Sequence, residues 1–271
     1  MKRNQHIDLQ ELTIKELRSI QLDILEDVND FCKKNSINCF LAYGTLIGAI
    51  RHKGYIPWDD DIDIMMTRPD YEKFITNYHS DKYNILNVDL DPRYPYSFSK
   101  IHDPSTKVVE YSSLKFDIGV NIDLFTIDGL PNTENKRNTY TRKLMRYIRL
   151  KEIKRIKFSK NRKMSKTILL FLLKTGIFFI PSQFVIKRLV KLIKQYDFNK
   201  SSFASELNFF QKNRVFRKEL FMDSVNVVFE NKIYKAPVGY DIWLKTIYGN
   251  YMELPPVEER KTHHVFHVYK K

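Results

Sequence analysis

The sequence predicts a mixed α/β fold, in which a core built on a mixed sheet is joined to a basic helical region. Three observations support this prediction. Apolar residues near the N-terminus recur at helical spacing, two later stretches alternate acidic with apolar residues as strands do, and the middle of the chain is strongly basic. A chain of 271 residues that is 43% hydrophobic is long enough to bury a substantial core.

The first elements of this core can be predicted in order along the chain. Thr13 followed by Glu16 forms a capping-box signature, and apolar residues continue at helical spacing until about Asn35. A buried strand is then expected at residues 39–44. Residues 45–52, which follow a glycine, are predicted to form a short helix.

The most informative stretch is DDDIDIMM, residues 59–66, in which acids at 59, 61 and 63 alternate with apolar residues. Because successive side chains of a strand point to opposite faces, the three acids are expected on one face. Like charges on a buried strand are costly unless a cation compensates, and Mg²⁺ prefers carboxylate oxygens. The stretch therefore predicts a site for Mg²⁺ or Mn²⁺; the alternative is a solvated acidic loop.

A second acidic strand is predicted within residues 116–131, where Asp123 is flanked by apolar residues. If this strand pairs with the first, Asp61, Asp63 and Asp123 converge to hold one or two metal ions against a phosphate. Asp128 stands just before a Gly-Leu-Pro sequence, which is typical of a turn.

The charge of the chain is concentrated in one segment. The net charge is +14, and residues 136–166 hold 14 Lys or Arg against one acid, Glu152. The rest of the chain is therefore close to neutral, which favours a localised basic surface over a nucleic-acid coat. No nucleic-acid partner is expected.

An apolar run, residues 167–181, follows the basic segment. It is too short to span a bilayer as a helix, which takes about 20 residues. A basic segment followed by an apolar one is typical of a surface anchor on an anionic membrane. A core helix behind a solvated basic helix is the alternative.

The remaining composition indicates a cytoplasmic protein. Cys32 and Cys39 show no disulfide or metal-ligand spacing, and two thiols in so long a chain are typical of a reducing compartment. The N-terminus, MKRNQHIDLQ, has no apolar region of the kind that a secretion signal carries.

The motifs together resemble a known family. Gly44-Thr45, then Asp61-x-Asp63, then Asp123 is similar to the nucleotidyltransferase pattern, and YGTLIGAIRHKGYIPWDDDIDI resembles the signature of LicD-type phosphocholine transferases, which are related to fukutin. NIDLFTIDGLP and YGNYMELPP resemble the same family, whereas residues 134–220 carry no such motif.

The resemblance implies a nucleotidyltransferase-fold enzyme that moves phosphocholine, or a similar alcohol phosphate, from a CDP-linked donor. The acceptor would be a sugar hydroxyl of a cell-surface glycan or of a lipid-linked, teichoic-acid-type precursor, and CMP would leave. An enzyme of this kind is expected at the inner face of the cell membrane.

Roles for individual residues follow from this resemblance and from their chemistry. Asp61, Asp63 and Asp123 are expected to hold the metal and to carry catalysis. Phosphate oxygens of the donor are expected to contact the set Gly44, Thr45, Arg51, Lys53 and Lys100. Choline has three candidate aromatic partners by cation-π attraction, Tyr43, Tyr55 and Trp58, and core packing is the alternative for each. Arg260 is a candidate to close over the nucleotide.

The predicted organisation is a catalytic core at residues 1–133, a basic helical region at 134–220, and a C-terminal segment at 221–271 that returns to the core. Two rival functions stay open. One is attachment of a nucleotide to RNA or to a small molecule, and the other is noncatalytic binding of nucleic acid by a basic protein.

Overall fold

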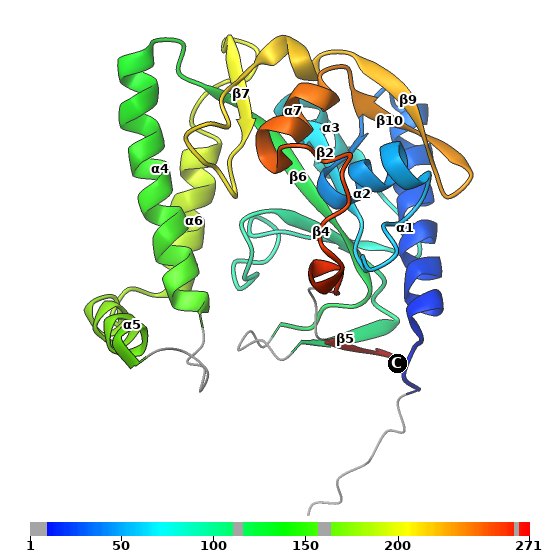
Figure 1. Cartoon of the computed structure of the whole chain (residues 1–271), viewed down its shortest axis with the longest axis horizontal. Coiled ribbons are helices and arrows are strands. Elements are labelled where there is room, and N and C mark those ends of the chain that lie inside the picture. The colour runs from blue at the N-terminus through cyan, green and yellow to red at the C-terminus, as the bar shows by residue number, and fades with distance from the viewer. Residues whose placement is uncertain (1–9, 111–115, 157–163, 263–265) are drawn as a thin grey trace, which may run out of the picture.

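The computed structural model describes residues 10–110, 116–156, 164–262 and 266–271, to which every structural statement below refers. Figure 1 shows a mixed sheet surrounded by helices, with two long helices standing to one side. In spatial order the main sheet contains β3 (Asn84–Leu86), β4 (Ser99–His102), β6 (Asn121–Leu130), β2 (Asp63–Thr67), β1 (Phe40–Leu41), β10 (Lys232–Pro237) and β9 (Ser224–Phe229). The predicted mixed α/β fold is confirmed.

The register at the centre of the sheet aligns three charged residues. β2 and β6 run parallel, with Asp63 opposite Asp123, and β4 runs antiparallel to β6, with Lys100 opposite Asp123. Opposite residues of adjacent strands point to the same face. The three side chains therefore form one row across the sheet.

Four helices pack around this sheet. α1 (Ile14–Lys34) contacts β6, and α3 (Arg68–Asn77) contacts both β2 and β6. α2 (Tyr43–Ile47) continues into a π-helical turn at Gly48–His52, and α7 (Tyr240–Tyr248) follows β10. The largest buried cluster, which includes Ile24, Phe40, Ile64, Leu124 and Trp243, joins these helices to the sheet.

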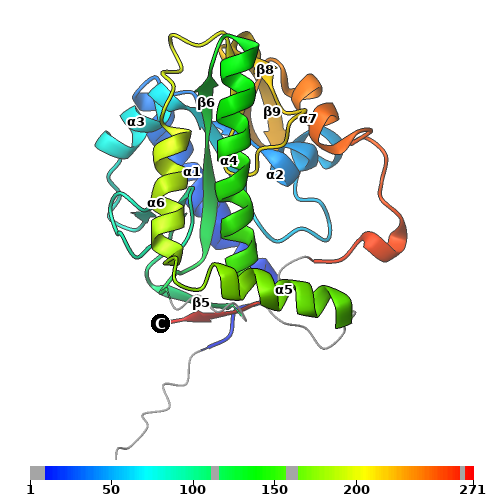
Figure 2. The same cartoon turned by 90° about the vertical axis from the view of Figure 1, so that its left-hand side faces the viewer.

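The basic region forms a helical layer on the side opposite α1 (Figures 1 and 2). α4 (Glu134–Arg155) and α6 (Ser182–Ile193) pack together there through a second apolar cluster that includes Tyr140, Leu144 and Leu189. β7 (Phe203–Glu206) pairs with the C-terminal half of β6 and with β8 (Phe216–Arg217), so this part of residues 134–220 belongs to the main sheet.

The C-terminal segment returns to the N-terminal half of the chain. β10 pairs with β1, and β11 (Phe266–Lys270) pairs with β5 (Thr106–Glu110) in a separate two-stranded sheet. A 3₁₀ turn at Lys218–Phe221 lies between β8 and β9, and another at Val257–Glu259 lies between α7 and β11.

The first predicted elements are confirmed. Thr13 caps α1, because its hydroxyl accepts from the N–H of Glu16 while the Glu16 carboxylate accepts from the N–H of Thr13. The helix ends at Lys34, next to the expected Asn35. The buried strand is short, and the helix after it begins at Tyr43 rather than after Gly44.

Two details of the predicted acidic strands are wrong. The first strand begins at Asp63, because residues 59–62 form a loop that leads into it. Asp128 does not lie in a turn. It is fully buried inside β6, where the guanidinium of Arg68 neutralises it with contacts of 2.7 and 3.0 Å.

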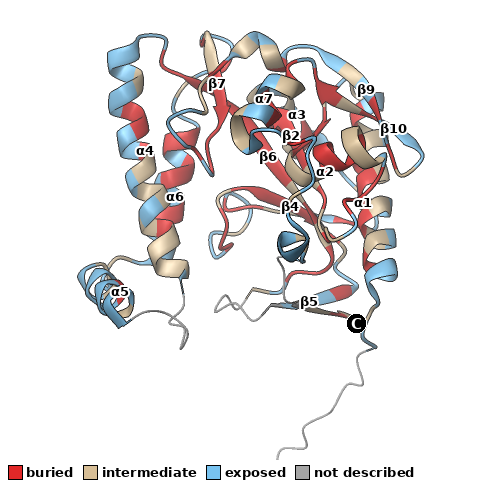
Figure 3. Cartoon of the chain, viewed as in Figure 1, coloured by how far each residue is buried: buried red, intermediate tan, exposed pale blue. Residues whose placement is uncertain are grey.

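α5 (Met164–Gly176) is not a core helix, although it contains most of the apolar run. Leu170 is its one buried residue, and Figure 3 shows most of the helix as exposed. Within the described ranges, none of the helices combines the length and the apolar character that crossing a membrane takes.

Candidate active site

A cleft of about 1420 Å³ lies where β2 and β6 begin, between α2 and the segment that follows α7. Four aspartates line it: Asp59, Asp61, Asp63 and Asp123. We call it the acidic cleft. The carboxylates that the sequence assigns to a metal are therefore brought together, and Asp59, which the sequence left without a role, joins them.

The backbone around Asp63 is held on both sides by the signature segment. Its N–H donates to the hydroxyl oxygen of Thr45 at 2.8 Å, and its C=O accepts from the N–H of Ala42 at 2.9 Å. Ile62 precedes it and accepts from the N–H of Asp123 at 2.8 Å. Helix α2, β2 and β6 are thus joined where the acids lie.

Lys100 supplies a cation to this row of acids. Its ammonium group donates to carboxylate oxygen Oδ1 of Asp123 and, at 2.9 Å, to the side-chain carbonyl of Asn121. The residue is largely buried, and its ammonium also lies 5.1 Å from the ring centre of Tyr96. A lysine in this position neutralises one of several crowded carboxylates.

Helix α1 positions the loop that carries the first acids. Arg18 donates to the carbonyl of Pro57 at 3.2 Å, and Gln21 donates to the carbonyl of Asp60 at 2.9 Å. A side chain at Gly44 would collide with the loop, since a Cβ there would lie 2.6 Å from Oδ2 of Asp59. Gly44 therefore allows the loop to approach α2.

The electrostatics of the acidic cleft favour added positive charge. Burial, together with the neighbouring Asp61, raises the pKa of Asp59 to about 8. Burial, with Asp61 and Asp123 nearby, also raises the pKa of Asp63 well above its usual value. Carboxylate oxygens of Asp59, Asp60 and Asp61 lie within 4.8 Å of one another. This donor set fits a hard divalent cation, which would relieve the repulsion.

The basic candidates for phosphate binding are placed differently from one another. Arg51 lines the acidic cleft, and its guanidinium donates to the carbonyls of Tyr251 at 2.6 Å and Glu253 at 2.9 Å. Lys53 does not line the cleft, and its ammonium donates to the carbonyl of Ile50 at 3.3 Å. Thr45 is buried and supports Asp63.

Two of the three candidate choline-contacting aromatics lie in the cleft. Tyr43 and Trp58 line it, and the guanidinium of Arg260 lies 5.6 Å from the ring centre of Trp58. Tyr55 is buried elsewhere, where its hydroxyl donates to Gln21 at 3.1 Å and its ring lies under Arg18. Tyr55 thereby joins α1 to the acidic loop.

The cleft contains further aromatic residues that sequence reasoning missed. Tyr96, Phe98, Phe125, Phe209 and Tyr248 line it. They come from four separate segments, so no local spacing in the sequence could have indicated that they meet. Arg155, at the end of α4, also lines the cleft, with its guanidinium 5.1 Å from the ring centre of Tyr96.

A buried polar network, also missed, holds Tyr43 in the cleft. The hydroxyl of Tyr43 donates to Glu206 at 2.9 Å, and Glu206 accepts further bonds from Asn208 at 2.6 Å. Burial raises the pKa of Glu206 and lowers that of Lys151, whose ammonium donates to the carbonyl of Asn208 at 3.2 Å. The helical layer is thereby joined to the signature segment.

Carboxylates on adjacent parallel strands, beside a helix that starts with Tyr-Gly-Thr, are the arrangement of a nucleotidyltransferase-type domain. The family model described as LicD/FKTN/FKRP, nucleotidyltransferase domain, matches residues 36–160. These residues contain α2 and the four aspartates of the cleft.

Comparison with curated proteins extends the likeness to nearly the whole chain. It is 32% identical to the lipopolysaccharide cholinephosphotransferase LicD of Haemophilus influenzae, over 96% of this chain and 99% of that protein. A shorter stretch of 58 residues is 40% identical to an uncharacterized protein of Rickettsia typhi, covering 21% and 19% of the two chains. The chain belongs to the LicD family and is a transferase.

Proposed function

We propose that this protein transfers phosphocholine from CDP-choline to a sugar hydroxyl of a cell-surface glycan or its lipid-linked precursor, and releases CMP. The similar protein of Haemophilus influenzae is named a lipopolysaccharide cholinephosphotransferase, and the likeness covers almost all of both chains. A lipopolysaccharide or a teichoic-acid-type precursor is the acceptor class, and Mg²⁺ or Mn²⁺ is the cofactor.

One observation carries the proposal: Asp61, Asp63 and Asp123 line a single cleft, two of them on register-paired strands. Burial and the neighbouring Asp61 and Asp123 raise the pKa of Asp63, and a divalent cation would offset the negative charge that these carboxylates carry when ionised. Asp61, Asp63 and Asp123 would hold the ion, which would supply Lewis-acid stabilisation of the donor's phosphate oxygens.

The transfer itself is an in-line displacement at the phosphorus that carries choline. The acceptor oxygen forms a bond to this phosphorus, the bond to the bridging oxygen of the pyrophosphate breaks, and CMP leaves with that oxygen. Asp123 is proposed either to share the metal ion or to take the proton of the acceptor hydroxyl. Lys100, beside it, offers positive charge to the transferred phosphate.

The aromatic residues of the cleft suit the choline group. A quaternary ammonium has no N–H to donate, so it is recognised by the faces of aromatic rings, at about 0.5 to 2 kcal/mol per contact. Tyr43 and Trp58 are the proposed partners from the signature segment. Arg51, which lines the cleft, and Arg260, whose guanidinium lies 5.6 Å from the ring centre of Trp58, are proposed to contact the nucleotide phosphates.

The proposed localisation is the cytoplasm, at the inner face of the cell membrane, where lipid-linked glycan precursors are accessible. Residues 1–133 are proposed as the catalytic core, residues 134–220 as a region that associates with the membrane, and residues 221–271 as a segment that completes the core.

The test is CMP release from CDP-choline with Mg²⁺ and a glycolipid extract. The wild type is expected to release CMP. Asp61→Asn and Asp63→Asn are expected to release at least about 100-fold less, because each removes a metal-binding carboxylate. Asp81→Asn is the matched control, since Asp81 is fully exposed outside the cleft.

Three other outcomes discriminate the alternatives. Release from CDP-ethanolamine, CDP-ribitol or CDP-glycerol, but not from CDP-choline, would keep the chemistry and change the alcohol. Pyrophosphate release from a nucleoside triphosphate would replace the proposal with nucleotidyl transfer. Equal activity of Asp61→Asn and the wild type would refute the assignment of the site.

A further inference from the structure

α5 and the turn after it present an apolar surface that nothing in the described part of the chain covers. We define the α5 surface by Met164, Ile168, Phe171, Leu172, Phe178 and Phe179, all of which are exposed. Phe178 is 75% and Phe179 is 90% exposed. A concentration of exposed large apolar side chains on one short segment is typical of a site of interaction with a protein or a membrane.

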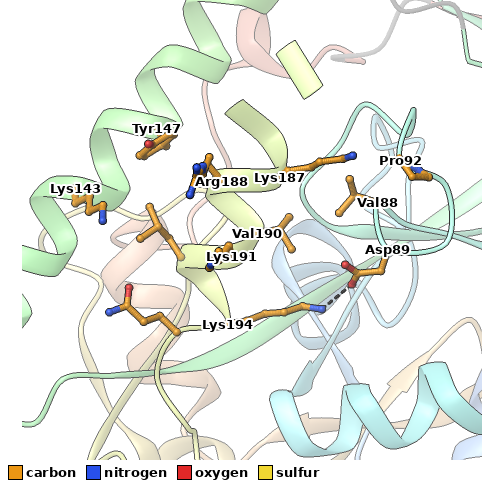
Figure 4. Close-up of a pocket in the computed structure, with 12 residues that line it drawn as sticks. Val88, Asp89, Pro92, Lys143, Tyr147, Lys187, Arg188, Val190, Lys191 and Lys194 are labelled. Carbon is orange, nitrogen blue, oxygen red and sulfur yellow. Dashed lines mark hydrogen bonds and ion pairs between the residues drawn. The ribbon is translucent and has the colours of Figure 1, made fainter. Parts of the chain in front are cut away.

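The segments next to the α5 surface are strongly basic. Residues 153–156 and 164–196, the described parts of this stretch, contain eight Lys or Arg and no Asp or Glu. Lys187, Arg188 and Lys191 of α6, and Lys194 directly after it, line a groove of about 860 Å³ together with Lys143 of α4 (Figure 4). One acid, Asp89, lines the same groove and pairs with Lys194 at 2.6 Å. The helical layer is therefore a strongly positive surface.

The α5 surface is fixed near the acidic cleft. The ammonium of Lys154 donates to the carbonyl of Ile177 at 3.1 Å, and the ammonium of Lys174 donates to the carbonyl of Lys154 at 3.3 Å. Both bonds tie α5 to the last turn of α4. The next residue of α4, Arg155, lines the cleft and lies over Tyr96.

We infer that the α5 surface docks on the anionic face of a lipid bilayer, and that this docking presents the acidic cleft to an acceptor held in the membrane. Docking itself does not depend on the proposed function; the presentation of the cleft to an acceptor rests on it. Phenylalanine and leucine side chains enter the interface between head groups and acyl chains, and lysines attract anionic lipids. A second copy of this chain fits poorly, because two such basic surfaces repel one another.

Docking is tested by flotation of the full chain with vesicles. The wild type is expected to float with vesicles that contain phosphatidylglycerol, and much less with vesicles of phosphatidylcholine alone or at high salt. Phe178→Ser/Phe179→Ser is expected to weaken partition into the anionic vesicles by at least about tenfold, since the two aromatic side chains that would enter the bilayer interface are lost. Both residues are exposed, so the fold should tolerate the change.

The matched control is Val228→Ser/Ile233→Ser, which removes two exposed apolar residues that face each other on β9 and β10. This hairpin lies at the opposite end of the molecule from α5 (Figure 1). The control is expected to bind vesicles as the wild type does. Equal binding of both double variants, no binding by the wild type, or a wild-type dimer that Phe178→Ser/Phe179→Ser dissolves would overturn the inference.

A second assay separates docking from catalysis. Phe178→Ser/Phe179→Ser is expected to release CMP at the wild-type rate with a water-soluble sugar acceptor, and at least about tenfold more slowly with an acceptor embedded in vesicles. An equal loss with both acceptors would overturn the orienting role. If the proposed function fails, no acceptor yields CMP even with the wild type, while the flotation result stands by itself.

Discussion

The backbone N–H of Asp63 donates a hydrogen bond to the hydroxyl oxygen of Thr45 at 2.8 Å. Thr45 is buried, and its hydroxyl oxygen accepts a hydrogen bond from the strand that carries Asp63 rather than facing a substrate. The bond fixes the distance between α2 and β2 at the point where the acidic cleft opens. Thr45 therefore acts as a positioning residue for the carboxylates.

Thr45→Val should expose this role, because valine has nearly the same shape and accepts no hydrogen bond. We expect the free energy of unfolding to fall by about 1 to 3 kcal/mol, the cost of an unsatisfied buried N–H. CMP release is expected to fall by roughly 10- to 100-fold, because Asp63 is displaced. Thr45→Ser keeps the hydroxyl acceptor and should retain most of the stability and most of the CMP release. A Thr45→Val protein as active as Thr45→Ser would contradict this role.

Lys100→Met is predicted to make the protein more dependent on metal for stability. Lys100 and Asp123 are both mostly buried, and loss of one partner of such a pair costs about 3 kcal/mol. Added Mg²⁺ restores positive charge next to Asp123, so it should raise the melting temperature of Lys100→Met more than that of the wild type. Lys82→Met, at an exposed position, is the control. The same Mg²⁺ shift in all three proteins would argue against this account.

Arg68 and Asp128 are predicted to contribute to stability and not to turnover. Their pair is bidentate and Asp128 is fully buried, so Arg68→Met should lower the free energy of unfolding by about 3 to 5 kcal/mol. The exposed partner of Arg68, Glu72, provides the comparison: Glu72→Gln should cost less than about 1 kcal/mol. Denaturant titration measures both. CMP release per folded molecule should be unchanged, and a catalytic defect in fully folded Arg68→Met would refute this prediction.

His102 is predicted to make stability depend on pH in the weakly acidic range. Burial lowers the pKa of His102 to about 4, and its Nδ1 accepts from the N–H of Gly119 at 3.1 Å. The unfolded chain, with a histidine pKa of 6.5, binds the proton first as pH falls. The contribution of His102 to the free energy of unfolding is thus fully present above pH 6.5 and is lost as the pH falls toward about 4. The loss is at most about 3 kcal/mol.

The comparison that isolates this effect is His102→Asn, which keeps an acceptor for the N–H of Gly119. Urea titrations between pH 4 and 7 should give a shallower fall in the free energy of unfolding for His102→Asn than for the wild type. Parallel curves for the two proteins would show that other groups cause the pH dependence.

Local patterns were sufficient for much of the fold. The capping box of Thr13 and Glu16 and the spacing of apolar residues after it predicted α1 to within a residue of its end, because such signals act within one or two helical turns. The alternation around Asp63 and Asp123 predicted two strands, yet not where each begins. Strand ends depend on pairing partners, and β2 begins where Thr45 and Asp123 meet its backbone.

The sequence by itself determined the family signature, the choice of Asp61, Asp63 and Asp123 and the concentration of positive charge, since each depends on the residues around it. Only the tertiary structure decided that Lys100 pairs with Asp123, that Tyr55 bonds to α1 and does not line the cleft, and that Tyr43 donates a hydrogen bond to Glu206. It also decided that the apolar side chains of α5 face outward. The physical reason is that contacts between distant segments depend on strand order and packing, which no local spacing encodes.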